Sequence, residues 1–169
     1  MVDESTLSNT AYTLHAATPR DAELLTAFRV KLFRDLGHVP PEGPTPDFVS
    51  ACDAAHTRYL ESGTGMAWFA KAGERYVGSI VMLLHPRLPS PRLVPATEGY
   101  ILNVYVDPEW RKRGIATALM RTAMDRARSL GLARLRLHTT AAGRPTYANA
   151  GFRPREDEME LVLLGAGKV

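Results

Sequence analysis

The sequence predicts one α/β domain in which short strands alternate with amphipathic helices. The apolar runs have the composition of strands, and none is long enough to cross a bilayer. Between them, apolar residues recur at spacings of three and four, which indicates helices with one buried face. The 169 residues contain no internal repeat and no linker. We therefore expect residues 1–169 to form a single domain, with residues 1–11 as a flexible N-terminal tail.

The composition excludes several classes of protein. With 45% hydrophobic and 23% charged residues, the chain is neither disordered nor collagen-like. Cys52 is the single cysteine, so an intrachain disulfide and a cysteine-based zinc knuckle are both excluded. The histidines show no metal-ligand spacing, and we expect no metal site. The polar N-terminus lacks the features of a secretory signal, which predicts a cytoplasmic protein without a membrane partner.

The basic residues are concentrated in the second half of the chain. Lys and Arg number 21 against 18 acidic residues, and the consecutive Arg111, Lys112 and Arg113 begin the basic region. Such a region suits a polyanionic small molecule as well as a nucleic acid. No aromatic residues are interleaved with these arginines for base stacking, so we expect no nucleic acid partner.

The first half of the chain is punctuated by helix signals. Thr18 is a candidate N-cap, Pro19 occupies the first helical position, and Gly37 is a C-terminal stop. Arg29, Lys31 and Arg34 are expected on the solvated side of this helix. The predicted order is a strand over 12–17, a helix over 18–37, a proline-rich loop over 38–46, a helix from 46 or 47 to 61, and a hairpin of strands over 66–71 and 75–84.

The second half contains the clearest strand, which runs directly into a helix. The turn Asp107-Pro108 follows that strand, and Gly131 ends the helix. The predicted order is a proline-rich loop over 86–95, a strand over 100–106, a helix over 111–130, a strand over 132–139, a short helix over 144–150 and a last strand over 158–164.

The junction between the clearest strand and its helix has the properties of a phosphate site. Backbone N–H groups at a helix N-terminus favour anions, and Gly114 lets the backbone approach a pyrophosphate. Arg111 and Arg113 add positive charge, and Ala116 is small. The alternative is a solvated, arginine-rich helix start. The motifs of P-loop nucleotidases and Rossmann dehydrogenases are absent.

Two motifs resemble those of the GNAT superfamily of N-acetyltransferases. Arg111-Lys-Arg-Gly114-Ile-Ala116 is similar to the family signature Arg/Gln-x-x-Gly-x-Gly/Ala, and Tyr147-Ala-Asn-Ala-Gly151-Phe152 is similar to its Tyr-x-x-x-Gly-Phe. The order of elements over residues 12–164 also resembles that family. The resemblance implies a mixed central sheet of about six to seven strands flanked by about four helices, with acetyl-CoA as co-substrate.

The resemblance also implies where acetyl-CoA binds. Its pyrophosphate would meet the backbone N–H groups of the junction, and its pantetheine arm would lie along the edge of the preceding strand. That strand carries a bulge in the family, and an N–H near Val104 would bond the thioester oxygen. An asparagine often found seven residues before the tyrosine is replaced by Thr140, whose hydroxyl would contact the cofactor arm. The residues thus assigned to the cofactor are Val104, Tyr105, Val106, Arg111, Lys112, Arg113, Gly114, Ile115, Ala116, Thr117, Thr140 and Tyr147.

Three residues are candidates for the chemistry. The phenol of Tyr147 would protonate the departing CoA thiolate, and the alternative is a core tyrosine packed beside Phe152. The usual place of the family's basic glutamate holds Tyr100, and Glu98 lies two residues before it. Glu98 is therefore a candidate general base, and Asn103 could hold a water or a substrate group. A structural role is the alternative for both.

The sequence thus predicts an N-acetyltransferase that moves an acetyl group from acetyl-CoA to a primary amine by direct attack in a ternary complex. The acceptor would be a small molecule or a peptide, and its identity stays open. A homodimer is common among such folds, but no feature of the sequence decides this. The alternative function is an acyl-CoA-binding regulatory module without turnover.

Overall fold

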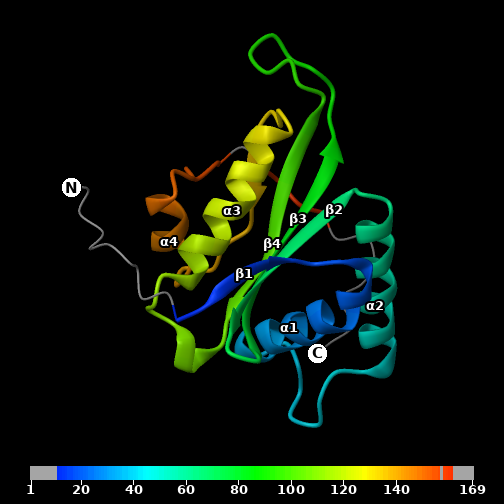
Figure 1. Cartoon of the computed structure of the whole chain (residues 1–169). Helices are drawn as coiled ribbons and strands as arrows, with labels where there is room; N and C mark the ends of the chain where they lie inside the picture. Colours follow the sequence, from blue (N-terminus) through cyan, green and yellow to red (C-terminus); the bar gives the residue numbers. More distant parts are fainter. Residues whose placement is uncertain (1–10, 157, 162–169) are drawn as a thin grey trace, which may run out of the picture.

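The computed structural model describes residues 11–156 and 158–161, and a mixed sheet forms its centre (Figure 1). The strands of this sheet are arranged in the order β1-β2-β3-β4-β5. The elements, in chain order, are β1 Thr13–Ala16, the 3-10 helix η1 Pro19–Asp21, α1 Ala22–Asp35, α2 Pro46–Glu61, β2 Gly65–Ala72, β3 Arg75–Pro86, β4 Thr97–Val106, the 3-10 helix η2 Pro108–Trp110, α3 Ile115–Ser129, β5 Leu135–Leu137 and α4 Arg144–Asn149.

The sheet combines antiparallel and parallel pairing. Strands β1 to β4 are antiparallel to their neighbours, whereas β5 runs parallel to β4 over three residue pairs, from Gly99 opposite Leu135 to Ile101 opposite Leu137. A parallel neighbour requires a crossover connection, which α3 provides. The predicted α/β class is therefore confirmed.

Helices cover both faces of the sheet and create two apolar clusters. In Figure 1, α3 and α4 lie on one side and α1 and α2 on the other. On the α3 side, Leu119 and Met120 pack against strand residues such as Ile101. On the α1 side, Leu25 and Phe28 pack with residues that include Tyr105. Side chains of β4 thus contribute to both cores, as expected for a strand buried on two faces.

The ends of several elements differ from the prediction. The first helix begins after a 3-10 turn, where the N–H of Thr18 donates to Asp21 Oδ2 over 2.7 Å. Helix α3 begins at Ile115 rather than at 111, because Lys112 and Gly114 have positive φ angles of 60° and 76°. The predicted strand over 132–139 is limited to Leu135–Leu137.

The described residues contain five strands, slightly fewer than the six to seven or so that the resemblance implied. The difference includes the expected last strand over 158–164. Residues 158–161 form no strand, and Met159 and Leu161 are exposed there, so their apolar character is not used in the sheet. Residues 162–164 and residues 1–10 of the expected tail lie outside the described part. No helix in the described part combines the length and the apolar character that a bilayer span requires.

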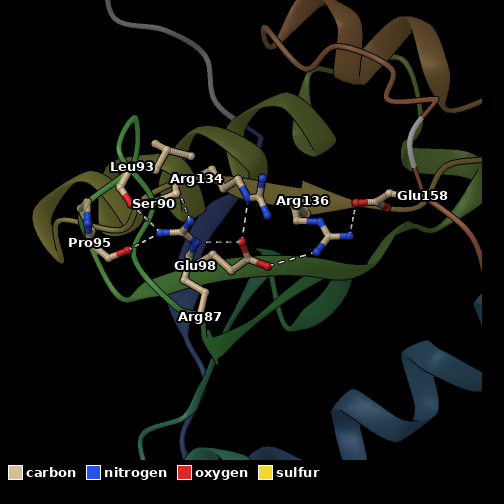
Figure 2. A network of polar contacts seen from close by, with 8 residues as sticks. All are labelled: Arg87, Ser90, Leu93, Pro95, Glu98, Arg134, Arg136 and Glu158. Atoms are coloured by element: carbon tan, nitrogen blue, oxygen red, sulfur yellow. Dashed lines mark hydrogen bonds and ion pairs between the residues drawn. The ribbon is translucent and has the colours of Figure 1, made fainter.

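A buried carboxylate joins β4 to β5 and to the loop that precedes β4. Glu98 lies at the start of β4 with a side chain that is 8% exposed, and it is ringed by arginines (Figure 2). Arg134 Nε donates to Glu98 Oε2 over 2.6 Å, and Arg136 Nη1 donates to Oε1 over 3.1 Å. Arg87 Nε lies 3.9 Å from the same carboxylate. Burial by itself raises the pKa of Glu98, but hydrogen bonds and charges from Arg134 and Arg136 outweigh it and hold the pKa below its usual range.

The third arginine also organises the loop over residues 87–96. Arg87 Nη1 donates to the carbonyls of Leu93 and Pro95, at 2.8 and 2.7 Å, and Nη2 donates to Ser90 Oγ (Figure 2). Glu98 therefore links three segments that are separate in sequence.

Replacing Glu98 by Gln should destabilise the protein strongly. The amide keeps the shape of the carboxylate but removes the counter-charge of Arg134 and Arg87, whereas Arg136 keeps its ion pair with Glu158, so we expect the free energy of unfolding to fall by about 3 kcal/mol. Urea denaturation at pH 7 measures this change. Glu109→Gln is the matched control, because Glu109 is 55% exposed and pairs with the exposed Arg75, so its loss should have a much smaller effect on stability.

The pH dependence provides a second readout of the same substitution. A pKa lowered by folding gives stabilisation that is complete above the unfolded pKa, about 4.3, and is lost as the pH falls through the folded value. The wild type should therefore lose stability more steeply below pH 4 than the Glu98→Gln variant. Parallel curves for the two proteins would contradict the role of the carboxylate.

Candidate active site

Strand β4 contains a bulge at its centre. Ser79 pairs with Tyr105 and Val81 with Leu102, so Asn103 and Val104 together lie opposite Ile80 alone. Asn103 has a φ of 52°, in the left-handed region that asparagine tolerates better than most residues. The bulge implied by the family resemblance is thus present. Its extra residue shifts by one the alternation of side chains between the two faces of the sheet, so that Tyr105 points to the α1 side and Val106 to the α3 side.

The other edge of β4 opens shortly before the bulge. Pairing with β5 ends at Ile101 opposite Leu137, and no described strand pairs with this edge of β4 beyond that point. A cavity of about 670 Å³ borders the opened strand. An unpaired edge presents N–H and C=O groups that an extended ligand can meet.

The turn that follows β4 forms a concave set of backbone donors. Lys112 and Gly114 are left-handed, and left-handed residues within a turn aim successive N–H groups inward as an anion-binding nest. In the described part of the chain, the first helical hydrogen bond runs from the Ala118 N–H to the Gly114 carbonyl, and the N–H groups of residues 113–117 have no backbone partner. The positive end of the α3 dipole adds to this site.

The cavity brings most of the residues assigned to the cofactor together. Its walls come from the end of β4, the nest, α4 and the last turns of α1. Those of the assigned residues that line it are Val104, Tyr105, Val106, Arg111, Lys112, Gly114, Ile115, Ala116, Thr117 and Tyr147. Arg113 and Thr140 do not line it. The additional wall residues Leu32, Asp35, Trp110, Ala142, Gly143 and Thr146 were not assigned from the sequence.

The arginine side chains of the junction make contacts within the protein. Arg111 Nε donates to the Val106 carbonyl over 2.9 Å, and its Nη2 donates to Asp35 Oδ2 over 2.5 Å. The Arg113 guanidinium lies 4.6 Å from the centre of the Trp110 ring. The contacts of both side chains are therefore with the protein, and the donors left for a phosphate are the backbone N–H groups and the side chain of Lys112, which lines the cavity.

Tyr147 lies on α4 and faces the same cavity. Burial raises the pKa of its phenol, which keeps the group protonated at neutral pH. Its ring also packs edge-on against Phe152, with 6.2 Å between ring centres, so the packing and the chemical interpretations of this residue are compatible. Thr140 lies at the turn before α4, where its hydroxyl accepts a hydrogen bond from the Gly143 N–H over 3.2 Å.

The contacts of Glu98 argue against its candidacy as general base. Both carboxylate oxygens are bound by arginines, and the lowered pKa makes the group a weaker base. Tyr100, in the place of the family's glutamate, shares a hydrogen bond with Nδ1 of His138. Asn103 is buried at the bulge and accepts a hydrogen bond from Arg29.

The polar contacts that α1 makes with β4 and with the turn after it were not predicted from the sequence. Arg29 and Lys31, expected on the solvated side, reach Asn103 and Asp107 respectively, each over 2.7 Å. Arg29 is adjacent in sequence to Phe28, a buried residue of the apolar stripe. A charged residue that flanks such a stripe lies at the border between helix and sheet, and this is the signal that could have identified Arg29.

Comparisons with known proteins agree with this geometry. A family model described as the acetyltransferase (GNAT) family matches residues 32–152. A glucosamine 6-phosphate N-acetyltransferase from Trypanosoma brucei brucei is 30% identical over 129 residues, which cover 76% of this chain and 84% of that protein.

Solved structures show the same fold. The crystal structure of a predicted acetyltransferase with acetyl-CoA from Clostridium acetobutylicum has a TM-score of 0.82 at 23% identity, covering 90% of this chain and 96% of that one. A GCN5-related N-acetyltransferase from Ralstonia eutropha JMP134 has a TM-score of 0.76 at 28% identity, covering 89% and 98%. The chain therefore belongs to the GNAT acetyltransferase family and is an acyl-CoA-dependent N-acetyltransferase with acetyl-CoA as its co-substrate.

Proposed function

We propose that this enzyme transfers the acetyl group of acetyl-CoA directly to the primary amine of a small acceptor, within a ternary complex. One observation carries the proposal. A single cavity is lined by the anion nest, by the unpaired edge of β4 at the bulge and by Tyr147. The reaction requires a site for the pyrophosphate of the cofactor, a site for its extended pantetheine arm, and a proton donor for the leaving thiolate.

The cofactor would follow the cavity from the nest to the bulge. Its pyrophosphate would accept hydrogen bonds from the N–H groups of residues 113–117. The pantetheine arm would lie along Val104, Tyr105 and Val106 as a short added strand. The thioester oxygen would then meet the N–H of Val104, which stabilises the negative charge that develops when the amine attacks.

The chemical step balances with Tyr147 as the acid. The neutral amine nitrogen attacks the thioester carbon, the C–S bond breaks, and the sulfur leaves as a thiolate that takes the phenolic proton of Tyr147. The proton lost by the amine passes to solvent, from which Tyr147 is reprotonated. The raised pKa of Tyr147 supports this role because the phenol is present in its acid form. We do not assign the base to Glu98, since its ion pairs occupy it.

The relative in Trypanosoma brucei brucei indicates the first acceptor to test. Its name is that of an enzyme acting on glucosamine 6-phosphate, and the match covers most of both chains. We propose an amino sugar phosphate as the acceptor class.

Thermal unfolding and thiol release test the function together. Acetyl-CoA at 100 times its Kd should raise the Tm by roughly 5–10 °C. Free thiol should then appear on addition of glucosamine 6-phosphate, and more slowly with glucosamine, the matched acceptor without phosphate. Stabilisation without thiol release on any amine would favour the regulatory module, and no stabilisation would overturn the proposal.

Substituting Tyr147 by Phe should affect the chemical step selectively. The ring can still pack against Phe152, but the proton donor is lost, so we expect kcat to fall by about tenfold or more while the Kd for acetyl-CoA is retained. Steady-state kinetics and calorimetric titration give the two values. Tyr76→Phe is the matched control, since Tyr76 packs on Phe69 away from the cavity and its hydroxyl should have no effect on kcat.

Substituting Gly114 by Ala should affect the cofactor site selectively. Its φ of 76° strains any L side chain, and although an added Cβ meets no neighbouring atom within 4 Å, relief of that strain would turn the N–H groups of the nest, so we expect the Kd for CoA to rise by about tenfold or more. Gly131→Ala is the matched control, because Gly131 has a similar φ of 64° beyond the opposite end of α3. Both variants should lose stability to a similar extent, and equal loss of CoA affinity in both would contradict the nest.

A further inference from the structure

We propose that Arg29 is a positioning residue for this reaction, which acts through Asn103 to fix the bulge that aims the Val104 N–H at the thioester carbonyl. The inference rests on the proposed function, because it concerns the oxyanion contact at Val104. Arg29 belongs to neither motif that led to the family, and it lies on α1, 74 residues before Asn103 in the sequence.

The direction of the Val104 N–H is determined by the peptide unit that it shares with Asn103. A peptide unit is planar, and its C=O and N–H point in opposite directions. The carbonyl of Asn103 accepts a hydrogen bond from Ser79 Oγ of β3 over 3.5 Å. The N–H of Val104 must then point away from β3, towards the open edge of β4 that borders the cavity.

The conformation of Asn103 needs an external hold. Asparagine tolerates a left-handed φ better than most residues but does not prefer it, and the contact from Ser79 is long, so a further contact is required to hold this conformation. Arg29 Nη1 supplies the hold by donating to Asn103 Oδ1 over 2.7 Å, a short charge-assisted bond. The bulge therefore depends on a helix that lies across the face of the sheet.

A contact with an aromatic ring also restrains the side chain of Arg29. Its guanidinium lies 4.6 Å from the centre of the Phe33 ring on the same helix. No carboxylate among the described residues pairs with it, so its recorded polar contact is with Asn103. An arginine stacked on a ring and bonded to an uncharged amide is well placed to orient that amide.

Asn103 carries a second sign of a constrained position. The residue is 4% exposed, and within the described part of the chain its side-chain Nδ2 has no hydrogen-bond partner. A buried unpaired donor destabilises the fold, and such a cost is tolerated where backbone geometry serves function. The position of Asn103 is therefore not the one that would give its side chain a full set of hydrogen bonds.

A carbonyl-labelled cofactor gives a test that needs no acceptor. In wild-type protein, the ¹³C resonance of the thioester carbonyl of bound acetyl-CoA should move downfield, because the Val104 N–H polarises it. In Arg29→Met the resonance should return towards its free position while the Kd for CoA is unchanged. Arg29→Lys, which keeps a charged donor, should restore part of the shift, and kcat with glucosamine 6-phosphate should fall by about tenfold or more in Arg29→Met.

Lys31→Met is the matched control. Lys31 also extends from α1 and makes a 2.7 Å contact, but with Asp107 beyond the bulge. Its loss should lower the Tm to a similar degree and keep the carbonyl shift. In Asn103→Ala, which removes the amide but keeps the cost of the left-handed φ, the shift should fall as in Arg29→Met, and the double variant should show no further loss, because Arg29 acts through Asn103.

The outcomes separate the inference from the proposed function. An unshifted carbonyl in wild type overturns the oxyanion contact and the role of Arg29 together. A shifted carbonyl that persists in Arg29→Met overturns the role of Arg29 alone. Additive losses in the double variant would mean that Arg29 acts independently of Asn103. A rise in the KM for the acceptor, without a fall in kcat, would mean that Arg29 acts on the acceptor. Either result would overturn the positioning role of Arg29.

Discussion

The single extra residue in β4 is the constraint on which the site depends. Because Asn103 and Val104 together face Ile80, the strand bends and its alternation restarts. Tyr105 can then pack on Phe28 below α1 while Val106 joins the core below α3. Without the bulge, one of the two helical layers would lose its partner on β4, so the packing of both faces and the exposure of the strand edge follow from one backbone feature.

Helix α1 connects the parts of the site that are far apart in sequence. Arg29 contacts the bulge, Lys31 contacts Asp107 in the turn after β4, and Asp35 contacts Arg111 at the start of the nest. These contacts follow the helix axis from its middle to its end. A displacement of α1 would therefore disturb the strand, the turn and the nest together, which makes the helix a common wall of the cavity and of the bulge.

Local features of the site were predictable from the sequence, whereas its long-range contacts were not. Gly114 and the basic junction follow directly from a strand, a turn and a helix start, and Tyr147 belongs to a compact motif. Arg29 and Glu98 could not be interpreted in this way, because their partners lie 74 and 36 to 38 residues away and depend on the register of the sheet. The last strand was predicted from apolar residues, yet Met159 and Leu161 are exposed.

Two constraints at opposite ends define where β4 and β5 separate. At one end, Gly99 allows close contact, since a Cβ there would lie 2.5 Å from Leu135 Cδ2, and Glu98 holds Arg134 and Arg136 on either side of Leu135. At the other end, the bulge turns β4 before Val104. The parallel pairing is thus clamped over three residue pairs and then released. A carboxylate that performs this clamping must stay ionised and bound, which is why its chemistry suits structure better than proton transfer.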